Sequence, residues 1–183
     1  MEETETVPLN HASHDAGATL LNPALRDAQR IIDEWVAGNT SSELNLSNLE
    51  LTELPSLPFN LKWLNCSNNQ LTSLSLLPST LIILNCNNNQ LTSLPPLQQS
   101  LKSLYCSSNQ LTKLPELPQK LTTLFCDDNR LTELPTLPHS LSIMCRTGNP
   151  IQYPPPEINR SLDTIRTWMS KNPLNLLKSA DKR

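Results

Sequence analysis

Five cysteines and three histidines are the residues of this 183-residue chain best suited to nucleophilic or metal chemistry. Such groups act as catalysts or zinc ligands where several of them converge on one point. The histidines are scattered, because His11 and His14 lie in the polar N-terminal stretch and His139 lies far along the chain. His11, His14 and Asp15 resemble part of a metal site, but a structural zinc site usually takes four ligands in a folded frame. We therefore expect no metal ion there.

Four of the cysteines recur at intervals of 20 residues. They are Cys66, Cys86, Cys106 and Cys126. Zinc-binding cysteines usually come in pairs two to four residues apart, whereas residues 20 apart belong to successive repeats and are buried one by one. A small buried thiol behaves as a hydrophobic side chain. The pattern predicts core cysteines, no cofactor and no catalytic residue, so we do not expect an enzyme.

The bulk composition restricts the partners of the chain. A net charge of −3 and a pI near 5.6 provide no basic patch, which nucleic acids and anionic membranes require, so we expect neither as a partner. No apolar run approaches the ~18 residues of a membrane span, and the acidic N-terminus lacks the layout of a secretory signal. We therefore expect neither membrane insertion nor the general secretory route. An odd number of cysteines without such a signal fits a reducing compartment.

From Ser41 to about Pro155 the sequence repeats with a period of 20 residues. The clearest copy is LTTLFCDDNRLTELPTLPHS, residues 121–140, and leucine recurs at the first, fourth, eleventh and fourteenth positions of the repeat. A coil of 20 residues is too short for a strand and a full helix. The L-x-C segment is therefore predicted to be a short strand, and the L-P-x-L-P segment an extended return.

No single coil can bury its own leucines, so the coils must stack. The predicted fold is a leucine-rich-repeat solenoid with a short parallel β-sheet on the concave face, an extended, polyproline-like convex face and one capping helix at each end. The ninth position of the repeat holds asparagine, whose amide can bond backbone groups that the turn leaves unpaired. These asparagines are Asn69, Asn89, Asn109, Asn129 and Asn149. With 16 prolines and 3 glycines, we expect little left-handed backbone.

Helical caps are predicted at both ends of the stack, where apolar cross-sections would otherwise be exposed. Asn22 and Pro23 mark the start of the first helix and Gly38 marks its end. Its apolar face comprises Leu25, Ala28, Ile32 and Trp35. A second helix is predicted over 157–171, and its apolar face comprises Ile158, Leu162, Ile165, Trp168 and Met169. The predicted organisation is a flexible segment at 1–21, a cap at 22–40, six repeats at 41–155, a cap at 156–172 and a flexible tail at 173–183.

The coil L-x-x-L-x-C-x-x-N-x-L-T-x-L-P-x-L-P resembles the short bacterial repeat of YopM and of the IpaH and SspH-type effectors. The resemblance covers residues 22 to about 155, including the helix and the segment SSELNLSNLELTELP that lead into the first coil. It implies a protein that a specialised secretion system delivers into the host cell cytoplasm, where it binds another protein.

Two features depart from that pattern. The larger relatives carry a C-terminal ubiquitin-ligase domain with a Cys-x-Asp nucleophile, whereas about 35 residues follow the last coil here. Cys126 and Asp128 do spell Cys-x-Asp, but Cys126 belongs to the inward cysteine ladder. In the sixth coil, Arg146 takes the expected core position and Cys145 the outward one, so we expect the sheet to end irregularly there.

Side chains alternate across a strand, so positions three, five and seven of each coil are predicted to face outward from the sheet. These columns carry most of the variation between coils. Four apolar side chains are expected to anchor a partner: Trp63, Ile83, Tyr105 and Phe125. The polar rim is predicted to comprise Asn65, Asn85, Asn87, Asp127, Asp128 and Arg130. The alternative is that Trp63 and Phe125 lie flat on neighbouring side chains of the sheet.

The sequence thus predicts a protein-binding module without catalytic residues, which holds a host protein or another bacterial effector enzyme and inhibits it by covering its surface. One alternative is an adaptor that recruits substrate to a ubiquitin ligase or other enzyme on a separate chain. Another is a self-assembling structural protein. For the first two we expect a monomer in the absence of the partner.

Overall fold

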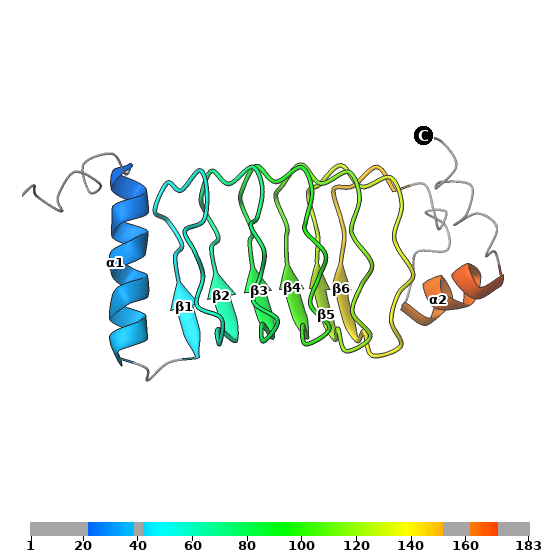
Figure 1. The fold of residues 1–183 in the computed structure, drawn as a ribbon. Helices are drawn as coiled ribbons and strands as arrows, with labels where there is room; N and C mark the ends of the chain where they lie inside the picture. The colour runs from blue at the N-terminus through cyan, green and yellow to red at the C-terminus, as the bar shows by residue number, and fades with distance from the viewer. Residues whose placement is uncertain (1–21, 39–41, 152–161, 172–183) are drawn as a thin grey trace, which may run out of the picture.

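The computed structural model describes residues 22–38, 42–151 and 162–171. Helix α1 (Pro23–Gly38) stands at one end of a stack of coils, and α2 (Leu162–Lys171) lies at the other end (Figure 1). Each coil contributes one short strand to a single sheet of six parallel strands in sequence order. The strands are β1 (Glu43–Asn45), β2 (Trp63–Asn65), β3 (Ile83–Asn85), β4 (Ser103–Tyr105), β5 (Thr123–Phe125) and β6 (Ile143–Cys145). The chain is a leucine-rich-repeat solenoid, as predicted.

The register of the sheet follows the sequence period, because each residue pairs with the residue 20 positions later. Leu44 lies opposite Leu64, and Leu64 lies opposite Leu84. Backbone bonds continue past the short strands, since the amide of Cys66 donates to the carbonyl of Asn85 at 2.8 Å. One repeat of the sequence is therefore one step of the solenoid, and equivalent side chains form straight columns.

The core consists of the predicted leucine ladders. Leucines at the first, fourth and eleventh positions are almost completely buried, for example Leu61, Leu64 and Leu71. Each buried leucine side chain stabilises the fold by about 1.5–3 kcal/mol relative to exposure. The four cysteines of the ladder are likewise buried and free, which confirms their predicted place in the core.

The asparagine of the ninth position satisfies backbone groups of two adjacent coils. The side-chain Oδ1 of Asn69 accepts hydrogen bonds from the amides of Leu49 and Leu51, at 3.1 and 3.0 Å. Its Nδ2 donates to the carbonyl oxygens of Leu46 and Cys66, at 2.8 and 3.0 Å. The predicted structural role of this position is confirmed.

The expectation of little left-handed backbone is wrong. Position eight of every coil has a positive φ. These residues are Asn48, Asn68, Asn88, Ser108, Asp128 and Gly148, with φ between 51° and 67°. Asparagine and aspartate tolerate this conformation better than other residues with a Cβ, because their short polar side chains bond locally. The scarcity of glycine therefore did not indicate the absence of such turns.

Helix α1 covers the first coil. The side-chain Oδ1 of Asn22 accepts a hydrogen bond from the amide of Ala24 at 3.0 Å, which is the predicted N-cap. Ala28 and Ile32 are buried in the same apolar cluster as Leu44. Leu25 and Trp35 pack against that cluster while remaining partly exposed.

The prediction of an irregular sixth coil is also wrong. Strand β6 keeps the register of the sheet, with Phe125 opposite Cys145 and Leu124 opposite Met144. Arg146 is buried at the core position, and its two terminal guanidinium nitrogens lack hydrogen-bond partners. The register survives because the strand bonds are made by the backbone and do not depend on the inward side chain.

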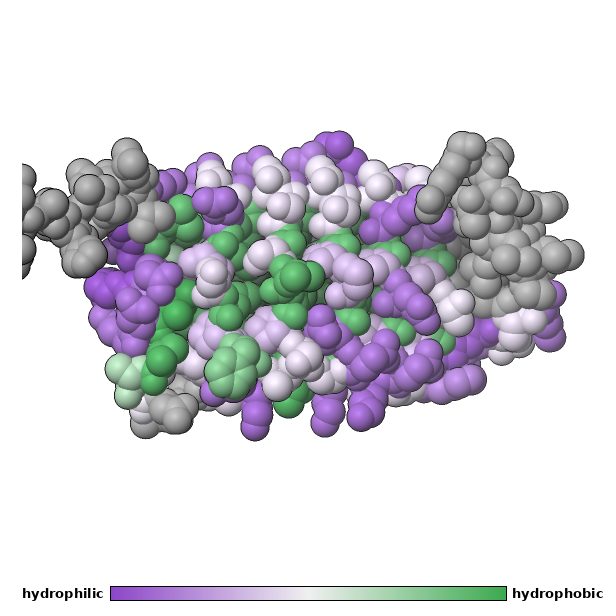
Figure 2. All heavy atoms as spheres, in the orientation of Figure 1, coloured by the Kyte–Doolittle hydropathy of each residue, from purple (hydrophilic) through white to green (hydrophobic). Residues whose placement is uncertain are grey.

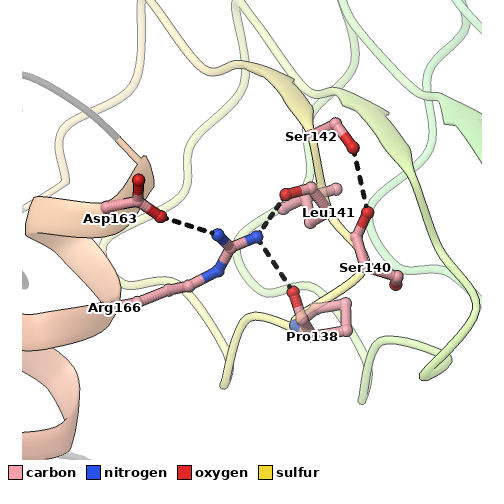
Figure 3. A network of polar contacts seen from close by, with 6 residues as sticks. All are labelled: Pro138, Ser140, Leu141, Ser142, Asp163 and Arg166. Atoms are coloured by element: carbon pink, nitrogen blue, oxygen red, sulfur yellow. Dashed lines mark hydrogen bonds and ion pairs between the residues drawn. The ribbon is translucent and has the colours of Figure 1, made fainter.

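Helix α2 covers the last coil. Ile165 is buried and Leu162 packs against the same core. Arg166 of this helix donates to the carbonyl oxygens of Pro138 and Leu141 and pairs with Asp163 (Figure 3). Ile158 and the side chains of Trp168 and Met169, the other members of the predicted face, lie outside the described residues. So do the two segments predicted to be flexible, 1–21 and 173–183.

Among the described residues, no helix has the length and apolar character needed to span a membrane.

Candidate protein-binding surface

The concave face, as we use the term, is formed by the third, fifth and seventh residues of each coil. Because strand side chains alternate, the central leucine of each strand points inward and its two neighbours point outward. The outward side chains of β2 to β5 are half-buried or exposed, as predicted from their columns. The sheet therefore displays the residues that vary from coil to coil and hides the residues that repeat.

Four large apolar side chains on this face follow one another on adjacent strands. Trp63 on β2 lies in register with Ile83 on β3, both at position three. Tyr105 on β4 lies in register with Phe125 on β5, both at position five. We call these four residues the apolar diagonal, because the column changes between β3 and β4. Trp63 is 37% exposed, and the other three are half-buried.

The rings of Tyr105 and Phe125 are stacked, with centroids 5.3 Å apart and planes inclined at 23°. This distance is close to the spacing of ~4.8 Å between strands, so the two rings stand side by side along the solenoid. Phe125 thus has the intramolecular packing that the alternative interpretation expects. Mutual stacking fixes both rings before any partner arrives, which lowers the entropy cost of a contact with them.

Two of the predicted rim asparagines serve the fold. The side-chain Oδ1 of Asn65 accepts hydrogen bonds from the amide and hydroxyl of Ser67, at 3.2 and 2.8 Å. The Oδ1 of Asn85 accepts a bond from the amide of Asn87 at 3.2 Å. These bonds shape the chain at the end of each strand. In the described part of the chain neither side-chain NH2 group has an acceptor, so both remain available as donors.

The predicted polar residues of position seven link coils. The Oδ1 of Asn87 accepts a bond from the amide of Ser107 at 2.7 Å. Asp127 accepts bonds from the amide and hydroxyl of Thr147, at 2.8 and 2.7 Å, and from the hydroxyl of Ser107 at 3.3 Å. The carboxylate of Asp127 is thus held in place on the concave face.

Asp128 and Arg130 lie farther from the strands than the other candidates. Asp128 is exposed and occupies the left-handed turn, with φ 51°. Arg130 is exposed two residues later, and its backbone amide bonds the carbonyl of Leu111 at 2.9 Å. The structure therefore joins the diagonal, Asn65, Asn85, Asn87 and Asp127 on one face and places Asp128 and Arg130 beyond its edge.

Exposed apolar residues also occur outside the predicted set. Ile143 on β6 is 52% exposed and extends the third column of the concave face. Phe59 and Leu76 are 86% and 87% exposed on the return segments. Phe59 and Val36 also line a hollow of about 430 Å³ between α1 and the first return. Their signal was present in the sequence, because the other coils have polar or small residues at the position of Phe59, but only the strand columns were compared.

The apolar surface is uneven along the solenoid. On the side seen in Figure 2, hydrophobic residues gather over the first coils next to α1, whereas hydrophilic residues prevail over the last coils.

The cysteine ladder is poorly suited to nucleophilic chemistry. Burial raises the pKa of Cys66 and Cys126 to about 12, so both are thiols at neutral pH. The thiol of Cys126 donates to the carbonyl of Cys145, and the carboxylate of Asp127 is engaged on the opposite side of the strand. Within the described residues, no group of three or more His, Cys, Asp or Glu side chains could hold a metal ion.

Comparison with known proteins gives the same repeat class. Residues 59–99 and 99–139 match the family model of leucine-rich repeats in two copies. A comparison with curated protein sequences gives no match. Among solved structures, the leucine-rich-repeat domain of a Shigella effector is 39% identical with a TM-score of 0.69, and the alignment covers 74% of this chain and 62% of that chain.

Two structures of YopM are similar as well. YopM of Yersinia pestis, a leucine-rich effector protein, is 36% identical with a TM-score of 0.67, over 76% of this chain and 38% of that chain. YopM of Yersinia enterocolitica is 33% identical with a TM-score of 0.60, over 74% and 35%. The resemblance to the YopM and IpaH type of repeat is confirmed. The chain spans less than two thirds of the length of each of these three chains.

Proposed function

We propose that this chain is a non-catalytic bacterial effector module that binds one protein through the concave face and inhibits it by covering its surface. The observation that carries the proposal is the apolar diagonal. Four large apolar side chains occupy successive strands of a face whose other outward positions are mainly polar. Residues with a purely structural role repeat in every coil, whereas these four interrupt the repeat.

The size and chemistry of the diagonal fit an interface core. Aromatic side chains bury about 150–250 Å² each, and a standard interface buries roughly 800 Å² per partner. Three aromatic residues and Ile83 therefore supply a large part of the apolar contact. The NH2 groups of Asn65 and Asn85 and the carboxylate of Asp127 lie beside them as polar rim groups.

The similarity to the Shigella effector and to YopM supports delivery into a host cell. The partner is then a host protein or a second effector enzyme, and the low aromatic content elsewhere in the repeats favours a single main site. We further propose that the chain is monomeric in the absence of its partner.

Site-specific crosslinking tests the proposal. A photoreactive phenylalanine analogue replaces Tyr105 on the concave face, and a matched variant carries it at Leu76, which is exposed away from that face. Both variants are expressed from the native host and in the host cell that receives the protein. We expect one crosslinked protein that is specific to the Tyr105 variant. Crosslinks from Leu76 with none from Tyr105 would contradict the proposal.

The same experiment separates inhibition from recruitment. An inhibited enzyme regains activity when the complex is competed apart with unmodified chain carrying Tyr105→Ser, whereas an adaptor would be captured together with a ligase and its substrate.

A further inference from the structure

The apolar diagonal has dimensions that select the kind of partner segment, and the inference below rests on the proposed use of the concave face. The four side chains span three strand spacings of about 4.8 Å and two residue steps of about 3.3 Å. The diagonal is therefore about 16 Å long and runs across the strands at a slant. It offers one large side chain per strand, from Trp63 on β2 to Phe125 on β5.

An α-helix matches this spacing. It advances 5.4 Å per turn, so residues i, i+4, i+7 and i+11 on one helix face span about 16.5 Å. Each turn would place one apolar residue against one strand of the sheet. An extended segment instead repeats its side chains on one face every ~6.6 Å, which falls out of step with strands ~4.8 Å apart.

The backbone of the sheet gives a second reason against an extended segment. Strands β2 to β5 each pair with a strand on both sides, so their amides and carbonyls are engaged along the stack. An added strand could pair only at β1 or β6, outside the diagonal. The diagonal therefore offers side chains to a partner and no free strand edge.

Charges of opposite sign flank the diagonal. Lys62 and Lys102 are exposed immediately before β2 and β4. Asp127 and Asp128 follow β5 at the other end of the strands, and the carboxylate of Asp127 is held by Thr147. A helix lying between them is favoured if it carries acidic residues toward the lysines and basic residues toward the aspartates.

From this geometry we infer that the concave face binds an amphipathic α-helix of its partner, about three turns long. Apolar residues at i, i+4, i+7 and i+11 contact Trp63, Ile83, Tyr105 and Phe125. Acidic and basic residues lie on opposite sides of that apolar stripe. The bound helix runs along the solenoid and crosses the strands.

Two display libraries test the inference with the full chain as the target. One library randomises the outer face of a stable helical hairpin, and the other displays unstructured peptides of 12 residues. Both are selected on the wild-type chain and counter-selected on the Tyr105→Ser variant. We expect helical clones with apolar residues at i, i+4, i+7 and i+11 whose affinity falls at least tenfold on Tyr105→Ser and less than threefold on the matched surface variant Leu76→Ser.

The charge pattern gives a second measurement. The Lys62→Glu and Lys102→Glu double variant is expected to weaken the selected helices and to favour clones with basic residues on that side. Equal thermal stability of all variants shows that the changes act on binding.

The outcomes separate the helix from the proposed function. If only unstructured peptides give clones sensitive to Tyr105→Ser, the concave face binds partners but the helical inference is wrong. If neither library gives clones sensitive to Tyr105→Ser, while clones sensitive to Leu76→Ser appear, both the helix and the concave site are wrong.

Discussion

The side-chain amide of Asn129 donates a hydrogen bond to the carbonyl oxygen of Cys106 in the preceding coil, at 2.9 Å. It also donates to the carbonyls of Cys126 and Asp127 in its own coil, while its Oδ1 accepts from the amide of Leu111 at 3.0 Å. One buried side chain thus ties two coils together. This contact recurs along the stack and fixes the turn after each strand.

Asn129→Ala is expected to lower the free energy of unfolding by about 2–4 kcal/mol, because an unsatisfied buried backbone group costs about 1–3 kcal/mol and several would lose their partner. Urea denaturation followed by circular dichroism measures the change. Thr132→Ala, on the exposed surface of the same coil, is the control and should change stability by less than about 0.5 kcal/mol. Equal effects of the two substitutions would show that the amide bonds contribute little.

Gly148→Ala is expected to destabilise the last coil by about 1–2 kcal/mol, because Gly148 has a φ of +67° and an added Cβ favours negative φ. That Cβ would also lie 2.1 Å from Oδ1 of Asp128, so the Asp128 side chain must move. Ser108→Asn is the converse change at the same position of the fourth coil and should be neutral or stabilising. Thermal melts of both variants check the pair, and an unchanged melting temperature for Gly148→Ala would argue against the left-handed turn.

Arg146→Leu is expected to raise the free energy of unfolding by about 1 kcal/mol or more, since a buried charge without good partners is often less favourable than a hydrophobic side chain. Burial lowers the pKa of the Arg146 guanidinium, in line with the cost of placing a charge there. Leucine also occupies this position in the first coil, as Leu46. A destabilised Arg146→Leu variant would mean that the guanidinium makes favourable contacts in the intact protein.

Stability is expected to fall as the pH rises from about 9 toward 12. Burial raises the pKa of Cys66 from an ordinary value of 9.0 to about 12, so the unfolded chain loses this proton at lower pH than the folded chain. Deprotonation therefore favours unfolding within that window, and the contribution is fully present below pH 9. Urea midpoints at pH 8.5 and 10.5 measure the decline, which should be shallower in Cys66→Ala. An equal decline in both proteins would contradict the assignment.

The 20-residue period predicted the solenoid, its register and its core, because in a repeat protein each coil contacts mainly its neighbours. Two features of the backbone were predicted wrongly. The left-handed turns were missed because glycine was taken as their only signal, although Asn48, Asn68 and Asn88 stand at the same position. The sixth coil was expected to be irregular because Arg146 replaces an apolar residue, although backbone bonds maintain the register.

The candidate site was predicted less completely than the fold. The columns showed which side chains face outward, and Trp63 and Tyr105 lie there as expected. The engagement of Asn65 with Ser67 depends on the local path of the chain after the strand, which the period does not specify. The exposure of Phe59 on the return was missed because a convex residue was assumed to be structural. The role of the diagonal in binding remains a prediction.

The most direct test is the affinity of the crosslinked partner for two triple variants of equal thermal stability. One changes the concave face, as Trp63→Ser, Tyr105→Ser and Phe125→Ser. The other changes exposed apolar residues elsewhere, as Val36→Ser, Phe59→Ser and Leu76→Ser. Buried aromatic anchors carry most of the energy of an interface, so we expect the concave variant to lose at least about a hundredfold in Kd and the other to lose less than about threefold. The reverse result would place the binding site at the N-terminal cap and the convex returns instead.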